Sequence, residues 1–449
     1  MSRPIMTQEK STGPDNLMSE LFHSFEEGLN GDKNSAFHKI RSSAFEKYLA
    51  MGFPGLKHEE YKYTHLINKL PADLHLAEAD IPVVDIQSIH SVFPEESASA
   101  KTTFINGVPY GGLILPDEYK GRVEVLPLQD AIKRNPEILS GLLVSELENG
   151  KDPFIPLNTA LALNGLFINI SEKAHLTIPF YLIHYTDFSE PGLMVNNRNI
   201  IVSGKGSHFN FAEIFIGKDG QPGFENHCTT LIAEEGSDLH YAKIQLAGNQ
   251  SVHVSTTIVH QRKNTIFNSY TASFSGNMIR NNLNVFLDES NCESHLTGLF
   301  FPSGNDHIDN HTQVDHRVPN CYSNELYKGI LDGKSKGVFN GKIFVRPQAQ
   351  KTNAYQSNKN ILLTETASID TKPQLEIWAD DVKCSHGTST GKLDEEQLFY
   401  LRARGIDEKT ARALLIYAFA HDVAEKIQME DIKLLIDRLI QEKLGQTFL

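Results

Sequence analysis

Cys384 and His386 are the pair of residues in this sequence whose types and spacing most directly suggest chemistry. A thiolate is a soft metal ligand and an imidazole a borderline one, so the pair suits iron, copper or zinc. In an extended segment, residues two apart point to the same face. Lys383 beside the thiol and the small residues after His386 favour an accessible thiolate. One pair cannot complete a cluster or a tetrahedral site, so a functional site requires ligands from elsewhere, including another chain.

The alternative for this pair is a free cysteine and a histidine with local hydrogen bonds, which would have no metal role. A second candidate is the segment 306–316, where His307, Asp309 and His311 share one face if the chain is extended, followed by Asp315 and His316. Such a cluster suits a borderline metal, whereas a solvated strand face rich in histidine is the commoner explanation.

Other catalytic motifs are absent or incomplete. Two glycine-rich segments, 329–335 and 387–392, resemble a phosphate-binding loop, but each is one residue short and neither joins a strand to a helix, so we reject nucleotide hydrolysis. The four cysteines lie far apart without a Cys-x-x-Cys pair, which argues against a disulfide framework or a structural zinc site of ordinary spacing.

Charge and hydropathy narrow the class of protein. The 449 residues carry a formal net charge of −14 with a pI near 5.7, so we expect no nucleic-acid partner and no anionic membrane surface. The first residues lack the layout of a secretory signal, and no apolar run reaches the length of a membrane span. These features predict a cytoplasmic protein.

The elements that must position Cys384 and His386 are mostly strands. Periodicity predicts two helices over 16–51, an irregular stretch over 72–99, short strands from 102 to 126, and one or two helices over 130–147. From about 157 to 378 strand follows strand. Turns containing Gly206, Gly236, Asn264 and Asn291 recur at roughly 28-residue intervals, which favours a β-solenoid over a β-sandwich with regular spacing.

After Asp394 the pattern becomes helical, with helices predicted over 395–404, 407–427 and 430–444. Leu414, Leu415 and Phe419 belong to a helix whose apolar residues cover more than one stripe. We therefore expect either packing among the tail helices or the docking of a partner. The sequence predicts four regions: a helical region and linker (1–100), a mixed lead-in (101–156), the β core (157–391) and a helical domain (392–449).

The segment 324–406, from NELYKGILDGKSKG to the end of KCSHGTSTGKLDEEQLFYLRARGI, closely resembles the SufB/SufD family of iron–sulfur cluster assembly proteins. FPGLKHEEYKYT (53–64), TTFINGVPYGGL (102–113) and DPFIPLNTALALNGLFINI (152–170) extend the resemblance over most of the chain. The KCSHG segment points to the SufD branch, because SufB members differ there. The resemblance implies a mainly β fold: a right-handed parallel β-helix core flanked by N-terminal and C-terminal α-helical segments.

The resemblance also implies a non-enzymatic scaffold that works with SufB and two copies of the ABC-type ATPase SufC, which docks on the helical tail. It implies that His386 helps to hold a transient iron–sulfur cluster at the interface with SufB, and Cys384 matches the neighbouring cysteine of the family. No cofactor is expected to bind tightly to the isolated chain, which could form a homodimer. The alternatives are a β-helix carbohydrate enzyme similar to polysaccharide lyases and a purely structural β-helix partner.

Overall fold

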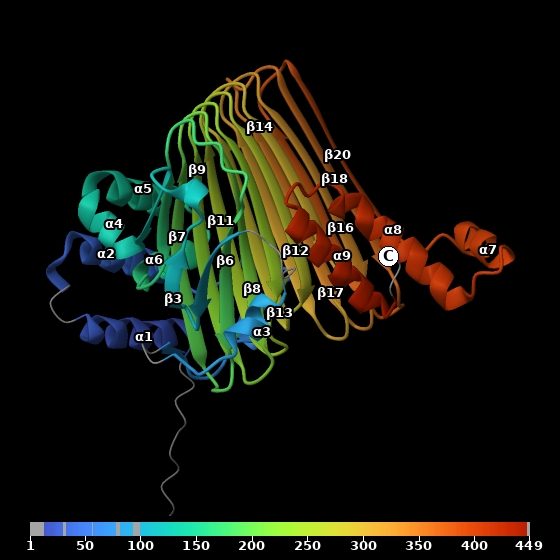
Figure 1. Cartoon of the computed structure of the whole chain (residues 1–449), viewed down its shortest axis with the longest axis horizontal. Coiled ribbons are helices and arrows are strands. Elements are labelled where there is room, and N and C mark those ends of the chain that lie inside the picture. Colours follow the sequence, from blue (N-terminus) through green and yellow to red (C-terminus); the bar gives the residue numbers. More distant parts are fainter. Residues whose placement is uncertain (1–12, 30–32, 56, 78–80, 93–98, 447–449) are drawn as a thin grey trace, which may run out of the picture.

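The computed structural model of the chain describes residues 13–29, 33–55, 57–77, 81–92 and 99–446. Its centre is a stack of parallel strands that alternate between two ten-stranded sheets. Figure 1 shows the stack running from the N-terminal helices to the C-terminal helices. This arrangement confirms the parallel β-solenoid and excludes the β-sandwich.

One sheet, called sheet A here, contains the odd-numbered strands of the stack. Its order is β19(Ser368–Ile377), β17(Lys336–Val345), β15(His307–His316), β13(Met278–Leu287), β11(Ser251–Gln261), β9(Gly223–Ala233), β7(Leu193–Ser203), β5(Leu166–Ile170) and β4(Val123–Pro127), with β1(His75–Leu76) paired to β7.

The other sheet, sheet B, contains the even-numbered strands from β6 to β20, with β2 and β3 beside β6. Its order is β20(Val382–Gly391), β18(Thr352–Leu362), β16(Tyr322–Leu331), β14(Glu293–Phe300), β12(Ile266–Ser275), β10(Asp238–Leu246), β8(His208–Lys218), β6(Phe180–Asp187), β2(Ala100–Ile105) and β3(Val108–Ile114).

The turns noticed in the sequence set the spacing of the rungs. Gly206, Gly236, Asn264 and Asn291 all have φ between 60° and 73°, a left-handed conformation that glycine and asparagine adopt more easily than other residues. Stacked turns are also bonded to one another: Gly206 N–H donates to Glu235 O at 2.9 Å, one rung further on. The repeat therefore reflects a backbone requirement of each rung.

Helices cover the outer faces of the two sheets. The N-terminal helices lie over the first rungs of sheet A, where Leu157 and Phe224 belong to one apolar cluster and Phe37 and Ile200 to another. The helices of this layer are α1(Pro14–Gly28), α2(Ala36–Met51), α4(Leu128–Arg134), α5(Pro136–Asn149) and α6(Phe154–Ala160), with the short helices η2(Glu59–Tyr61), η3(Leu66–Asn68), α3(Ile86–His90) and η4(Asp117–Tyr119) in the connecting segments. The sequence missed α3 and α6, which fall in segments predicted to be irregular and β.

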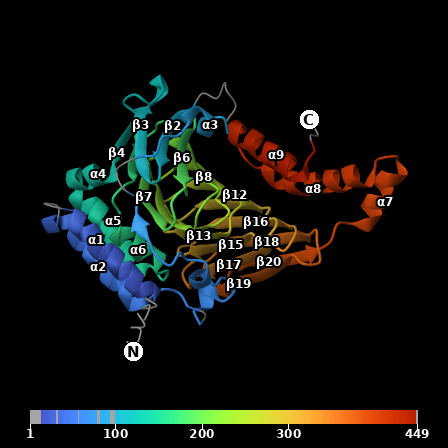
Figure 2. The ribbon, with the colours of Figure 1, turned by 90° about the horizontal axis from the view of Figure 1, so that it is seen from below.

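The tail helices are α7(Glu395–Ala403), α8(Glu408–Ala424) and α9(Glu430–Leu444), close to the predicted ranges. Helices α8 and α9 pack on the outer face of sheet B, where Ile416, Val423 and Ile436 join a cluster with strand residues such as Ile214. Helix α7 contacts α8 and projects away from the solenoid (Figure 2). No helix in the described part of the chain has the length and apolar character to cross a membrane.

The two ends of the solenoid differ. At the first rung, the short antiparallel strands β3 and β4 flank the parallel ladders. At the last rung, β19 and β20 are the outermost strands, each 10 residues long, and no strand of the described chain pairs with their outer edges. We call β19 and β20 the terminal rung. A free edge of this length is a template for pairing with another chain.

Candidate functional site

His386 lies in the middle of β20, within the terminal rung. The sequence placed Cys384 and His386 between a strand and a helix, whereas the structure places both inside a strand. The register pairs Cys384 with Ala354 and His386 with Gln356, and both of these partners are buried within the solenoid. Cys384 and His386 therefore share the inward face of β20, and His386 is exposed because no further rung covers it in the described chain.

Cys384 differs from the sequence-based expectation of an accessible thiolate. Its side chain is half-buried against an apolar cluster that includes Ile343, Val345 and Ala354. Burial raises the pKa of the Cys384 thiol above its ordinary value, despite Lys383 next to it. The thiol form is favoured at neutral pH, so of the two residues His386 is the more readily available ligand.

A buried carboxyl group lies two strands behind His386. Gln356, the register partner of His386, donates a hydrogen bond from Nε2 to Glu325 Oε2 at 2.7 Å. Burial raises the pKa of Glu325 to about 7. The inward face behind His386 is thus polar, and the Glu325 carboxyl group on it changes its charge near neutral pH.

The predicted partner-binding residues of the tail are partly used by the chain's own core. Leu415 and Phe419 pack against the apolar cluster between α8 and sheet B, and Leu414 is half-buried. Lys328 of β16 lies over the Phe419 ring at 4.3 Å from the centroid and donates to the Phe419 carbonyl oxygen at 2.9 Å. A salt bridge of 2.6 Å joins Lys328 to Asp422. These contacts fasten α8 to the solenoid.

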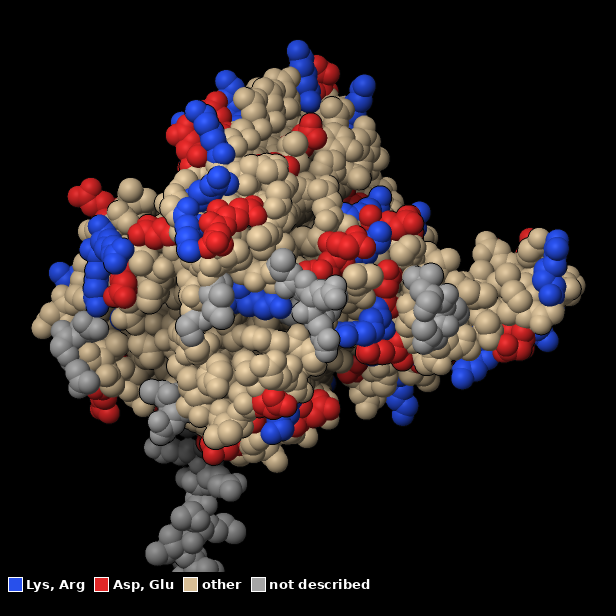
Figure 3. All heavy atoms as spheres, in the orientation of Figure 1, with Lys and Arg blue, Asp and Glu red and all other residues tan. Residues whose placement is uncertain are grey.

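The most exposed apolar side chains of the tail are on α7. Phe399 is 74% and Tyr400 58% exposed. Tyr400 and Leu415 line an open hollow of about 460 Å³ between α7 and α8, together with Asp394, Glu396, Gln397 and Leu401. Figure 3 shows the projecting lobe as mainly uncharged, whereas acidic and basic side chains are interspersed elsewhere on that face. Sequence reasoning missed Phe399 and Tyr400, although adjacent aromatic residues in a polar helix cannot both occupy one buried stripe.

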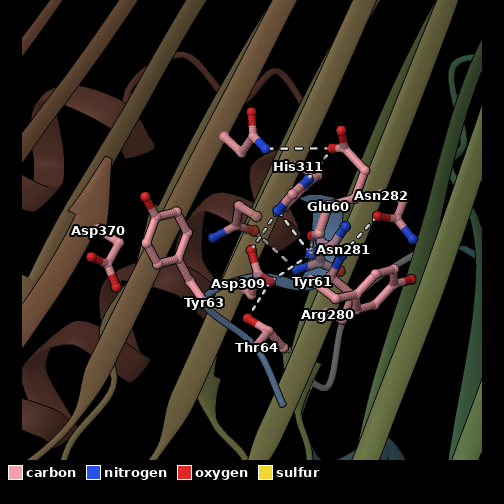
Figure 4. Close-up of polar contacts among 12 residues, drawn as sticks. Glu60, Tyr61, Tyr63, Thr64, Arg280, Asn281, Asn282, Asp309, His311 and Asp370 are labelled. Carbon is pink, nitrogen blue, oxygen red and sulfur yellow. Dashed lines mark hydrogen bonds and ion pairs between the residues drawn. The ribbon is translucent and has the colours of Figure 1, made fainter. Parts of the chain in front are cut away.

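His307, Asp309 and His311 lie together on the outer face of β15. They have protein partners, and Figure 4 shows the contacts of Asp309 and His311. Asp309 accepts from Arg280 Nη1 at 2.6 Å and from Thr64 Oγ1 at 2.5 Å. His307 Nε2 lies 3.1 Å from Thr64 Oγ1. His307 and Asp309 are buried, so the prediction of a solvated strand face was wrong, and these contacts give the cluster a structural role in place of a metal site.

The segment that covers this face is 59–64, which lies within the FPGLKHEEYKYT stretch (53–64). Tyr61 is buried, and the Arg280 guanidinium lies over its ring at 4.4 Å from the centroid. Glu60 pairs with Lys342 and with His311, and the hydrogen bond with His311 lowers the pKa of Glu60. We call this set of contacts the clamp, because it fastens the N-terminal segment to β13, β15 and β17.

Asp315 and His316 do not join that cluster. Asp315 forms ion pairs with Arg346 at 2.8 Å and with Arg317 at 3.1 Å, and His316 Nε2 is 2.9 Å from Ser323 Oγ in the interior. Alternation along β15 places His316 on the opposite face from Asp315.

Comparisons with known proteins agree with this architecture. A family model described as "SUF system FeS cluster assembly, SufBD core domain" matches residues 185–419, and one described as "SufBD protein N-terminal region" matches 14–182. The iron–sulfur cluster assembly protein SufD of Escherichia coli is 28% identical over 424 residues, covering 93% of this chain and 94% of that protein.

Two further relatives cover similar shares of both chains. The SufBD family protein slr0076 of Synechocystis is 27% identical over 413 residues, which is 90% of each chain. Protein ABCI7, chloroplastic, of Arabidopsis thaliana is 28% identical over 451 residues, covering 96% of this chain and 92% of that protein. Together with the core-domain match over more than half of the sequence, these findings show that the chain belongs to the SufBD family of iron–sulfur cluster assembly proteins.

Proposed function

We propose that this chain is a non-catalytic scaffold subunit that presents His386, with Cys384 beside it, to a nascent iron–sulfur cluster shared with a SufB-type partner. The observation that carries the proposal is the terminal rung. His386 is exposed on the inward face of β20, at the one end of the solenoid where long strand edges have no partner in the described chain. A SufB-type partner that pairs with these edges would bring its own ligands next to His386.

The chemistry of the residues supports a shared and labile site. An imidazole binds iron without becoming charged, and a thiolate from the partner would supply the soft ligand that a cluster requires. Cys384, with its raised pKa, contributes only if the cluster metal displaces its proton. His386 is therefore the principal ligand from this chain, and Cys384 is secondary.

The tail supports a second contact, with a SufC-type ATPase. Phe399 and Tyr400 are exposed aromatic side chains on the lobe that projects from the solenoid, and Tyr400 and Leu415 border a hollow that is also lined by polar side chains. Aromatic side chains of this kind often anchor protein interfaces. We propose that the ATPase binds this surface, with Leu414 at its margin, while Phe419 holds α8 on sheet B.

The test is to co-express the chain with its SufB-type and SufC-type partners under anaerobic conditions and to measure iron and acid-labile sulfide in the purified complex. We expect His386→Ala to lower both at least tenfold while the complex still assembles, because removal of a ligand typically weakens metal binding by about tenfold or more. Cys384→Ala should retain most of the loading.

His295→Ala is a matched control, because His295 is a partly exposed histidine of sheet B on β14, away from the terminal rung. Unchanged loading of the His386→Ala complex would overturn the ligand role and leave the structural-partner alternative. The family assignment favours cluster assembly over the carbohydrate enzyme, and absence of polyuronate cleavage by the purified chain would agree with that choice.

A further inference from the structure

The interior of the solenoid contains a second group of metal-ligand side chains, far from the terminal rung. Glu225 and His227 lie on β9 and His253 on β11, and one donor atom from each lies within 4.8 Å of the others. Glu225 and His253 are register partners on adjacent rungs. All three side chains are almost fully buried. Strands β13, β15 and β17 separate this group from β19, so it is distinct from the site at His386.

Most imidazole nitrogens of this group have no hydrogen-bond partner. Both ring nitrogens of His227, both of His184 and Nε2 of His253 are buried without one. Three nitrogens face carboxylates: His253 Nδ1 lies 3.1 Å from Glu225 Oε2, His227 Nε2 lies 3.6 Å from Glu225 Oε1, and His184 Nε2 lies 3.6 Å from Glu213 Oε1. Leaving a buried polar atom unpaired costs about 1–3 kcal/mol. His227 Nδ1, His184 Nδ1 and His253 Nε2 have neither a hydrogen bond nor an ion pair among the described residues, so these buried nitrogens are left for another species to satisfy.

The surroundings prepare these side chains as ligands. Thr186 donates from Oγ1 to Glu225 Oε1 at 2.6 Å, which orients the carboxylate. Phe215 packs against the rings of His184, His227 and His253 with centroid distances of 4.6, 4.8 and 4.9 Å, and forms an apolar wall.

We propose that Glu225, His227 and His253 bind one divalent transition-metal ion, Fe²⁺ or Zn²⁺, inside the solenoid of this chain. Two histidines and one carboxylate are the donor set of non-haem iron sites and of many zinc sites. His184, whose ring centroid is 4.9 Å from that of His227, is positioned to supply a fourth nitrogen. Ligand atoms of a tetrahedral ion lie about 3.3 Å apart for bonds near 2 Å, so modest side-chain rotations close the site.

A comparable group on the outer face of sheet B is a weaker candidate. His208 and His240 each approach the carboxylate of Asp238 at 3.0 Å, closer than the 3.6 Å at which His227 approaches Glu225. Asp238 and His208 are also partly exposed, and water can satisfy their remaining atoms. The interior group has no such access to water.

Burial of the interior site determines how it acquires its ion. The ligands come from adjacent rungs, so the site forms only when those rungs stack, and the ion is enclosed as the chain folds. The test therefore expresses the full chain without partners, in medium supplemented with either iron or zinc, and purifies it anaerobically. Metal per chain is then measured by inductively coupled plasma mass spectrometry.

We expect about one iron or zinc ion per chain in the wild type and at least a tenfold lower content in Glu225→Gln and His253→Gln. His316→Gln is the matched control, because His316 is equally buried inside the solenoid but bonds to Ser323. His386→Ala should retain the ion, which separates this inference from the proposed cluster site. A wild-type chain free of iron and zinc in both media would overturn the proposal even if the variants fail to fold. Metal retained in folded Glu225→Gln and His253→Gln would also overturn it.

Discussion

Gln356 donates a hydrogen bond to Glu325 at 2.7 Å inside the solenoid, and the register places His386 directly above Gln356. This relationship joins the candidate ligand to a buried carboxyl group with a pKa of about 7. The effect of the Glu325 carboxyl group on the stability of the chain can be measured on the chain alone, without a partner.

Glu325 makes the stability of the chain depend on pH. The pKa is raised by burial from 4.5 to about 7, so the folded state holds a proton that the unfolded state releases between these values. The proton on Glu325 stabilises the folded state fully below pH 4.5, and this stabilisation is lost as the pH rises through 7. The free energy of unfolding changes over this range by on the order of 3 kcal/mol. Glu325→Gln should therefore raise the free energy of unfolding at pH 8 and have little effect near pH 4.5. Urea denaturation at several pH values measures the difference, and identical pH profiles would contradict it.

The clamp should contribute strongly to folding. Asp309→Asn leaves the buried Arg280 without its ionic partner, and breaking a buried ion pair from one side costs about 3–5 kcal/mol. Asp370→Asn is the control, because the pair of Asp370 with Lys336 is partly exposed and is worth about 0–1 kcal/mol. Thermal denaturation of both variants tests the prediction, which fails if the two lose similar stability.

Substitutions on the tail should separate docking from folding. Tyr400→Glu and Phe399→Glu place charge on exposed positions, so we expect a normal circular dichroism spectrum and at least tenfold weaker binding of the SufC-type ATPase in calorimetry. Leu434→Glu, at a 49% exposed position on α9, is the control and should bind normally. Charge at Leu415 or Phe419 should also destabilise the tail, because both contact its core. Unchanged binding by folded Tyr400→Glu would exclude docking at α7.

Cys384 should behave as an ordinary or weakly reactive thiol. Since burial raises its pKa above 9.0, its alkylation by iodoacetamide should be slow at pH 7.5 and should increase up to and beyond pH 9. Cys228, Cys292 and Cys321 are buried and should react only after unfolding, which mass spectrometry of the digested protein can verify. A midpoint below pH 8 would show an activated thiolate and restore Cys384 as a principal ligand.

The rungs could be predicted from the sequence because their cause is local. Gly206, Gly236, Asn264 and Asn291 permit a left-handed turn, and they recur at roughly 28-residue intervals in the sequence. The strand state of residues 382–391 was not predictable in this way. This segment is polar and contains two glycines, and it becomes a strand because it pairs with β18.

Long-range contacts also explain what the sequence concealed at the candidate sites. Thr64 reaches Asp309 across 245 positions, so no local pattern around His307 revealed the clamp. Glu225 and His253 are separated by 28 positions, which matches the rung repeat. The 28-residue spacing is visible in the sequence, but only the strand register shows that it places Glu225 and His253 opposite each other.

The unequal ends of the solenoid imply a gradient of local stability along the stack. A strand in the middle has neighbours on both sides, whereas β19 and β20 each pair with one strand among the described residues, so opening begins most easily at the terminal rung. Backbone amides should exchange with deuterium fastest there and progressively more slowly toward β9. A chain that pairs with these edges would protect their amides from exchange. Slower deuterium exchange in β19 and β20 would therefore show that a partner has bound at the terminal rung.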